Sequence, residues 1–330
     1  MAFSTSHKPS DRGTDFFPVS PLMIFPEAQG NFEVYVAIKG QYVLYCKQNE
    51  RLNPEKRRKL HEDGVDFVYI LKTQRHGYDA YIQANLAQTL RNEELPLKER
   101  AFVLYSASIN TVEEFFEAGL PPSLKRRKLR DVISLVKESL DFLTIPQALS
   151  KLATLISCNY GLYAHSVNTL TLTAAVLQTY NPAHKTLRNA CIGALLHDIG
   201  KMSWTRNQFD RDAARIKALE FEAPDPHPSV GAAYCAALPI SREILACILL
   251  HHERVDGKGY PGGVNGEEIP FHVKALSLVN MYDRLTSKEQ GGAALAPFDA
   301  LKTIKSSLSG AFDPELFKRF VMILADARIT

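Results

Sequence analysis

The sequence has few cysteines, and no two of them stand at a spacing typical of metal or redox sites. The five cysteines lie far apart and mostly within apolar segments, at positions Cys46, Cys158, Cys191, Cys235 and Cys247. Zinc ribbons and CxxC redox motifs need closely spaced pairs, and small secreted folds need a dense disulfide framework. The absence of both patterns excludes these classes and predicts buried thiols in a reducing compartment.

An excess of one charge and long apolar runs are also missing. Lysine and arginine total 39 against 36 aspartate and glutamate residues, a net charge of +3, which gives no basic surface for a nucleic-acid polymer. No run of ~20 apolar residues could form a membrane span. The first 20 residues lack the ~7–15-residue apolar stretch of a secretory signal. We therefore expect a cytoplasmic protein with no membrane span and no nucleic-acid polymer as partner.

Length and composition predict a mainly α protein with a small α+β module at its N-terminus. The 330 residues have room for about two domains, and 45% hydrophobic with 23% charged residues is typical of folded proteins. We expect a flexible segment over residues 1–20, the α+β input module over 21–100, a helical linker over 101–145 and a larger helical domain over 146–330.

Hydrophobic periodicity predicts individual elements. Apolar residues alternate with more polar ones over 32–38, which indicates a half-buried strand. Two further strands are expected over 42–46 and 65–71. A capping box, Thr111-x-x-Glu114, predicts a helix that begins near residue 111. The i, i+3, i+4 spacing of apolar residues between 129 and 143 predicts an amphipathic helix of about four turns.

Histidine is concentrated in the predicted helical domain. Seven of the ten histidines stand between residues 165 and 272, at positions His165, His184, His197, His227, His251, His252 and His272. A histidine on an apolar helix is more often a core or surface residue than a metal ligand, and that interpretation is kept for His184 and His272. The other five stand in distinctive sequence contexts, which makes them candidate ligands.

Two motifs place histidines beside groups that suit phosphate chemistry. ALLHDIGK, over residues 194–201, sets His197 and Asp198 side by side. A carboxylate can bridge two metal ions while the adjacent imidazole binds one of them, and bound metal activates water near neutral pH. LLHHERVDGKGYPGG, over residues 249–263, has two adjacent histidines at a helix end and continues into a glycine-rich loop. A His-Asp pair alone is common by chance, but the two motifs in this order are not.

Together the motifs resemble those of the HD-GYP family, the bacterial cyclic di-GMP phosphodiesterases among the HD-domain metal hydrolases. The resemblance extends through His165-Ser166, His227-Pro228 with Gly231, and the later stretch LSLVNMYDRLTS at 276–287. It covers about residues 146–330 and implies a C-terminal HD-type helical bundle. It also implies an enzyme that hydrolyses cyclic di-GMP to linear pGpG or GMP in bacterial second-messenger signalling.

The resemblance further implies roles for individual residues. The cofactors would be two divalent metal ions, iron or manganese, with ligands at His165, His197, Asp198, His227, His251 and His252. Asp198 and Lys201 would be catalytic, because a Lys201 ammonium on the scissile phosphate stabilises the charge that develops there. The substrate-binding positions would be Lys201, Gly259, Tyr260, Pro261 and Asp283. The Gly-Tyr-Pro loop is expected to contact GGDEF-type or other signalling proteins, and a homodimer is left open.

Three positions depart from the family pattern. The late family motif reads roughly ADxxDALTSxRPY, whereas this chain has VNMYDRLTS at 279–287, so Asn280 stands at the position of a ligand Asp. An amide oxygen brings no negative charge, and Asn280 is therefore expected to be a weak ligand. Glu289-Gln290-Gly291 replaces the RPY segment, which removes a cationic contact to the dinucleotide. Gly161 stands where members with three metal ions carry Glu, so a third ion is not expected.

Three functions are compatible with the sequence. The first is the metal-dependent cyclic di-GMP phosphodiesterase. The second is a catalytically degenerate HD-GYP module that binds nucleotide or a signalling partner, which Asn280 and the lost RPY segment support. The third is hydrolysis of another phosphorylated nucleotide, since one fold serves several substrates. The first is favoured, because a purely structural role would not require imidazole at five positions together with Asp198 and Lys201.

Overall fold

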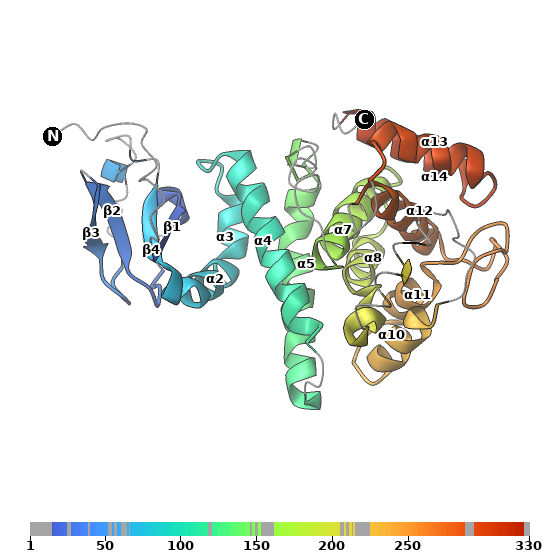
Figure 1. The fold of residues 1–330 in the computed structure, drawn as a ribbon, viewed down its shortest axis with the longest axis horizontal. Coiled ribbons are helices and arrows are strands. Elements are labelled where there is room, and N and C mark those ends of the chain that lie inside the picture. Colours follow the sequence, from blue (N-terminus) through green and yellow to red (C-terminus); the bar gives the residue numbers. More distant parts are fainter. Residues whose placement is uncertain are drawn as a thin grey trace. The chain divides into compact units, whose positions relative to one another are not determined.

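The computed structural model divides the chain into two compact units, Met1–Pro96 and Leu97–Thr330 (Figure 1). It describes residues 15–24, 28–38, 40–51, 55, 58–60, 65, 67–117, 121–145, 147–148, 151–152, 162–204, 208, 211–212, 214, 225–287 and 294–326. Among the helices of these residues, none combines the length and the apolar character that crossing a membrane requires.

The N-terminal unit is built on an antiparallel sheet with the strand order β1-β4-β2-β3. The strands are β1 (Phe16–Val19), β2 (Val34–Ile38), β3 (Gln41–Cys46) and β4 (Val68–Leu71). The helical segments whose bounds the structure describes are the short η1 (Pro21–Met23) and η2 (Lys72–Gln74), α2 (Arg75–Ala84) and α3 (Leu86–Arg91). This confirms the predicted α+β character of the N-terminal part.

The three predicted strands are confirmed, but two of them begin later than predicted. β2 begins at Val34 because Phe32 turns its ring onto α2, where it lies edge-on to Tyr78 and Tyr81 at centroid distances of 5.4 and 5.2 Å. β4 begins at Val68 rather than at residue 65. Burial alternates along β2 as predicted at Val34 and Val36, which are both buried. The alternation fails at the last residue, because Ile38 is exposed.

The prediction that residues 1–20 are flexible throughout is wrong for the strand β1. Phe16–Val19 pair with β4 along their whole length. Four residues are too few to show an alternating pattern, and Pro18 within them argues against a strand. The edge position of β1 tolerates the proline, and Phe16 is held by stacking on Tyr42 at a centroid distance of 4.1 Å. Residues 1–14 lie outside the described part of the chain.

The second unit is helical, which confirms the predicted mainly α fold. The helices whose bounds the structure describes are α4 (Leu97–Phe115), α5 (Pro122–Leu143), α7 (Leu162–Gln178), α8 (His184–Leu196), η3 (Ile199–Ser203), α10 (His227–Ala236), α11 (Arg242–Leu250), α12 (Phe271–Thr286), α13 (Pro297–Ser307) and α14 (Pro314–Asp326). Proline occupies the first turn of α5, α10 and α13, where its missing N–H leaves no helical hydrogen bond unmade. Ser241 begins α11 by accepting a hydrogen bond from the Ile244 N–H.

Helix α7 is the centre of this unit. Its side chains are buried on every face from Ala164 to Leu177, as expected for a helix without a polar stripe. The hydroxyls of Thr169 and Thr171 donate to the carbonyls of His165 and Val167 one turn earlier, at 2.9 and 2.8 Å. α7 contacts α4, α8, α12 and α14, and α8 and α12 lie beside it in Figure 1. A side chain on α7 therefore faces several helices at once.

The helix predicted from the spacing between 129 and 143 is confirmed as α5. Leu129, Val132, Val136 and Leu140 are buried, and α5 contacts α4, α7 and α8. That residues 101–145 act as a separate linker stays a prediction. The capping-box prediction is wrong: α4 begins at Leu97, and the Thr111 hydroxyl lies inside it, donating to the Ala107 carbonyl at 2.8 Å.

Candidate metal centre

Seven of the predicted site residues meet at one place in the helical unit. They lie on α7, at the ends of α8 and α11, at the start of α10 and on α12, and all are buried: His165, His197, Asp198, His227, His251, His252 and Asn280. Helix ends bring the HD pair and the two adjacent histidines into the interior at points where the backbone can turn.

Gly200 allows the HD turn to lie against the start of α10. A Cβ atom at Gly200 would stand 2.0 Å from the His227 carbonyl oxygen and 2.9 Å from the Gly231 nitrogen. Any side chain would therefore push η3 away from α10. The glycine of the HDIGK motif thus sets the short distance between Asp198 and His227.

The first cluster consists of His165, His197 and one oxygen of Asp198. The Nε2 atoms of His165 and His197 are 3.1 Å apart. Asp198 Oδ2 lies 3.6 Å from His165 Nε2 and 3.5 Å from His197 Nε2. Asn280 adjoins this cluster, because its Oδ1 atom is 3.0 Å from His165 Nε2.

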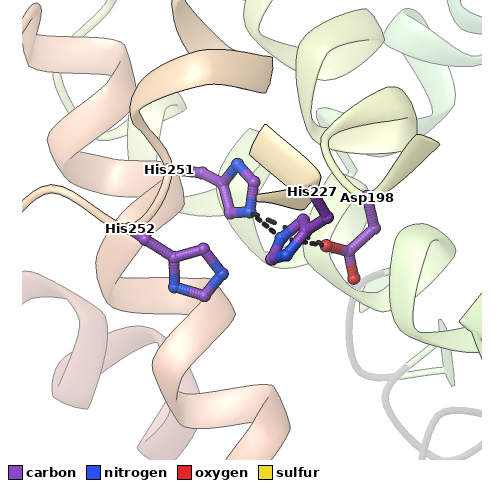
Figure 2. A group of neighbouring side chains, drawn as sticks. All are labelled: Asp198, His227, His251 and His252. Carbon is purple, nitrogen blue, oxygen red and sulfur yellow. Dashed lines mark hydrogen bonds and ion pairs between the residues drawn. The ribbon is translucent and has the colours of Figure 1, made fainter. Parts of the chain in front are cut away.

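The second cluster uses the other oxygen of Asp198, with His227, His251 and His252. Asp198 Oδ1 lies 3.1 Å from His227 Nε2 and 3.6 Å from His251 Nε2, and the two Nε2 atoms are 3.1 Å apart. Figure 2 shows His227 between Asp198 and His251, with His252 on the other side of the His227 ring. Asp198 therefore stands between the two clusters and directs one oxygen to each.

Hydrogen bonds on the outer ring nitrogens fix the protonation of these histidines. The Nδ1 atoms of His197 and His251 lie 2.7 and 2.9 Å from the carbonyl oxygens of Ala194 and Ile248. A carbonyl only accepts, so each Nδ1 carries the proton and each Nε2 presents a lone pair.

Carboxylates do the same for the rings of His165 and His227. His165 Nδ1 donates to Asp283 Oδ2 and His227 Nδ1 to Asp225 Oδ1, both at 2.6 Å. In each cluster two Nε2 atoms therefore lie 3.1 Å apart. Two lone pairs at this distance repel one another unless a cation, either a proton or a metal ion, lies between them.

The spacing of the ligand atoms suits a metal ion. Atoms held about 2.1 Å from one ion lie about 3.0–3.4 Å apart in octahedral or tetrahedral arrangements, and the observed separations are 3.1–3.6 Å. The Nε2 atom of His252 is buried and has no hydrogen-bond partner in the described part of the chain. A buried nitrogen without a partner is costly unless a ligand satisfies it. Both clusters could therefore hold a metal ion.

Electrostatics keep these groups in the forms that bind metal. Burial lowers the pKa of His197 to about 3, and burial is also the main cause that lowers the pKa of His251 and His252 well below the ordinary value. Burial opposes the charged form of Asp198, but the adjacent Lys201 ammonium and other neighbours outweigh it and hold the pKa of Asp198 well below its usual range. Neutral imidazoles at His197, His251 and His252 and a charged carboxylate at Asp198 result, as metal binding requires.

Asp283 supports His165 rather than pointing into open space. Its Oδ2 accepts from His165 Nδ1, and its Oδ1 accepts from Asn168 Nδ2 at 3.0 Å. Burial opposes the charged form of His165, but the hydrogen bond and charge of Asp283 outweigh burial and raise the pKa of His165. Both oxygens of Asp283 are thus engaged by the protein, and its predicted contact with substrate stays a prediction.

We expect Asp283→Ala to weaken metal binding by about 10- to 100-fold, the range found when a group that orients a histidine ligand is removed. The His165 ring would lose the acceptor that fixes its proton on Nδ1. Titration with Mn²⁺ followed by electron paramagnetic resonance measures the affinity. The matched control is Asp299→Ala on the exposed side of α13. Equal affinities in the two variants would show that Asp283 does not support a ligand.

Lys201 lies at the edge of the clusters within a chain of opposite charges. Its side chain is 4% exposed, and its Nζ is 3.0 Å from Asp198 Oδ2 and 3.4 Å from Asp212 Oδ2. The other oxygen of Asp212 pairs with Arg284 Nη2 at 2.5 Å. The Lys201 ammonium also stands over the ring of Trp204, 4.9 Å from its centroid. Lys201 is thus held beside Asp198. In this position its ammonium could contact an anion that binds at the clusters.

The Gly-Tyr-Pro loop is tied to the site through His252 and Glu253. The Tyr260 ring stacks on His252 with centroids 4.5 Å apart and is 7% exposed, whereas Pro261 is exposed. The Glu253 carboxylate is buried and accepts the backbone N–H groups of residues 262, 263 and 264 at 2.6–3.2 Å. A Cβ at Gly259 would lie 2.5 Å from the Arg254 nitrogen. The loop therefore packs Tyr260 inward, and its predicted role in binding partners stays untested.

Sequence reasoning missed five residues that support the site: Asn168, Asp212, Asp225, Glu253 and Arg284. Asp225 stands two residues before His227, a spacing that could have indicated its role. Asp212 and Arg284 are 72 residues apart in the chain, and no local pattern connects them. His184 is exposed, and His272 lies apart from the clusters with its Nε2 3.4 Å from the Glu243 carbonyl oxygen. For these two histidines the structure agrees with the predicted surface or core role.

Sequence comparison finds relatives that are named as cyclic dinucleotide phosphodiesterases. The chain is 27% identical over 229 residues to a cyclic di-GMP phosphodiesterase of Pseudomonas aeruginosa, covering 69% of this chain and 54% of that protein. It is 31% identical over 136 residues to the 3'3'-cGAMP-specific phosphodiesterase 3 of Vibrio cholerae, covering 40% of this chain and 29% of that protein. The chain thus spans about half the length of these relatives, or less.

The fold also has a counterpart among solved structures. Bd1817, an HD-GYP protein from Bdellovibrio bacteriovorus, superposes with a TM-score of 0.64 at 21% identity, covering 94% of this chain and 100% of that one. At this identity the likeness concerns the fold. The family model of the HD domain matches residues 146–316, which is more than half of the sequence and includes both metal-ligand clusters. With this match, the predicted resemblance is confirmed: the chain belongs to the HD-domain family.

Proposed function

We propose that this protein is a dinuclear metal-dependent phosphodiesterase that hydrolyses cyclic di-GMP to linear pGpG, to GMP, or to both. The observation that carries the proposal is the position of Asp198, whose two oxygens serve two separate histidine clusters. A bridging carboxylate of this kind offsets the repulsion between two cations a few ångströms apart.

The donor set indicates which residues would hold the ions. His165, His197 and Asp198 Oδ2 would hold one ion, with Asn280 as a weak neutral ligand. His227, His251, His252 and Asp198 Oδ1 would hold the other. Imidazole and carboxylate donors suit iron and manganese. When bound, such a pair supplies a nucleophile from water at neutral pH and stabilises charge on both the attacking and leaving oxygens.

The protein's own groups have defined parts in this reaction. Asp198 brings the negative charge of the centre, and the carbonyls and carboxylates behind the histidines keep the Nε2 lone pairs directed inward. Lys201 would donate a charge-assisted hydrogen bond to a phosphoryl oxygen as negative charge develops there. The buried surroundings of Lys201 strengthen that interaction, because water does not screen it.

The relatives support a cyclic dinucleotide as the substrate class. Those of Pseudomonas aeruginosa, Thermotoga maritima and Borreliella burgdorferi carry names that specify cyclic di-GMP, and one from Vibrio cholerae specifies 3'3'-cGAMP. Both nucleotides present the phosphodiester that the centre would attack. Both therefore belong in the assay of this protein.

Asn280 favours a second candidate function, a catalytically degenerate module that binds nucleotide or a signalling partner. Its Oδ1 approaches His165 Nε2 at 3.0 Å, and the side chain is 2% exposed. A neutral amide at this place reduces the negative charge available to the first ion, so one ion could bind weakly while nucleotide binding persists.

One experiment separates the two candidates. Protein purified without oxygen is analysed for iron and manganese, and its binding of cyclic di-GMP and 3'3'-cGAMP is measured by calorimetry. The protein is then incubated with each nucleotide while the products are resolved by chromatography. We expect close to two metal ions per chain after loading, and formation of pGpG or GMP. Nucleotide binding without hydrolysis in the presence of either metal would establish the silent module instead.

Asn280→Asp is expected to strengthen metal binding by roughly tenfold or more and to raise turnover, because it adds a charged oxygen donor. Metal occupancy at limiting Mn²⁺ and the turnover number with cyclic di-GMP measure the change. Asn265→Asp, in an exposed turn, adds the same charge elsewhere. Should Asn280→Asp change neither quantity while Asp283→Ala abolishes both, Asp283 rather than residue 280 serves the first ion.

A further inference from the structure

Arg284 is a buried cation beside the metal centre that the family motif does not contain. The motif ADxxDALTS has alanine at the position of Arg284. On α12, Arg284 follows Asn280 by one helical turn, so both residues lie on the same face. Asn280 adjoins the first cluster, and Arg284 is only 6% exposed. The guanidinium is therefore buried on the side of α12 that carries the ligand position.

Asp212 links Arg284 to Lys201. Its Oδ1 lies 2.5 Å from Arg284 Nη2, and its Oδ2 lies 3.4 Å from Lys201 Nζ. One carboxylate thus holds two cations from different elements, η3 and α12. Lys201 in turn contacts Asp198, the residue shared by the two metal-ligand clusters. Lys201 is therefore fixed 3.0 Å from the shared carboxylate, and Asp212 joins Arg284 to Lys201.

We propose that Arg284 and Lys201 together form a two-cation site for the phosphodiester group of the substrate, oriented by Asp212. This inference rests on the proposed function and adds to it a phosphate-binding residue. Arginine suits the role because its planar guanidinium donates two parallel hydrogen bonds to phosphate oxygens. The site provides the kind of cationic contact that the missing RPY segment removes, from a different point of the chain.

The test compares Arg284→Ala with the wild type and with Arg242→Ala, which removes an exposed arginine from the start of α11. With Mn²⁺ supplied, KM and kcat are measured for cyclic di-GMP and for bis(4-nitrophenyl) phosphate, a phosphodiester without a nucleobase. Metal content is measured in parallel. We expect Arg284→Ala to raise KM for both substrates at least about tenfold, the loss typical of one charge-assisted hydrogen bond. Metal content should stay unchanged, and Arg242→Ala should match the wild type.

Arg284→Lys keeps the positive charge but not the planar pair of donors, and it should fall between the wild type and Arg284→Ala. Arg284→Ala leaves the buried Asp212 carboxylate without its arginine partner, which could destabilise the fold. In that case the double variant Asp212→Asn/Arg284→Ala is used, because it also removes the charge of residue 212. The double variant should also show a raised KM.

Different failures lead to different conclusions. A wild type that neither binds nor hydrolyses cyclic di-GMP overturns the proposed function itself. A wild type that hydrolyses it while the Arg284 variants keep their KM overturns only the phosphate-binding role and leaves a structural ion pair. A raised KM for cyclic di-GMP alone would assign Arg284 to the nucleobase, and that result also contradicts the inference.

Discussion

Asp198→Ala is expected to remove metal from both clusters and to reduce hydrolysis of cyclic di-GMP below detection. Asp198 provides Oδ2 to the first cluster and Oδ1 to the second. Without the carboxylate, two cations a few ångströms apart have no shared anion to offset their repulsion. The remaining ligands are neutral, so each ion would also lose the one charged donor of its cluster.

Elemental analysis of protein purified without oxygen and calorimetric titration with Mn²⁺ measure the loss. Asp198→Asn serves as a variant of the same shape, because its amide keeps one oxygen but no charge, and it should lose metal as well. Asp299→Asn on α13 removes an exposed carboxylate and should leave metal content and turnover at wild-type values. Full metal content in Asp198→Ala would rule out the shared-carboxylate centre.

Lys201→Ala is expected to lower kcat for cyclic di-GMP by about 100- to 1,000-fold, the effect of removing one preorganised donor to a developing oxyanion. The ammonium is buried and 3.0 Å from Asp198 Oδ2. Under the proposed function it would act beside the reacting group, where water does not screen its charge. Metal content should be largely retained, because Lys201 carries no metal ligand atom. The combination of low kcat and retained metal distinguishes Lys201 from Asp198.

The control for Lys201 is Lys302→Ala, which removes an exposed ammonium from α13. The fluorescence of Trp204, the single tryptophan of the chain, reports on local structure because Lys201 stands over its ring. A Trp204 emission spectrum similar to that of the wild type would show that the site has not collapsed. If kcat in Lys201→Ala stays within a few-fold of the wild type, Lys201 orients Asp198 but does not stabilise charge on the phosphate.

Local sequence patterns were sufficient for the elements whose apolar residues recur at the period of a helix or lie in a short apolar strand segment. The apolar spacing between 129 and 143 follows directly from the geometry of an α-helix, and it is observed in α5. The strands β2, β3 and β4 were predicted from short segments rich in apolar and aromatic residues. The capping box failed because Thr111-x-x-Glu114 also fits the interior of a helix, where a threonine hydroxyl donates to a carbonyl one turn earlier.

The sequence by itself determined which residues could carry the chemistry: the HDIGK and HHE motifs name His197, Asp198, Lys201, His251 and His252 without reference to any fold. Only the tertiary structure decided how these groups are charged and oriented. Asp283 reaches His165 across 118 residues, and Arg284 reaches Asp212 across 72. Such pairs depend on how helices pack against α7, because side chains far apart in sequence meet only where burial brings their helices together. Protonation follows from the same packing, since each outer nitrogen takes the acceptor that a neighbouring turn or helix presents to it.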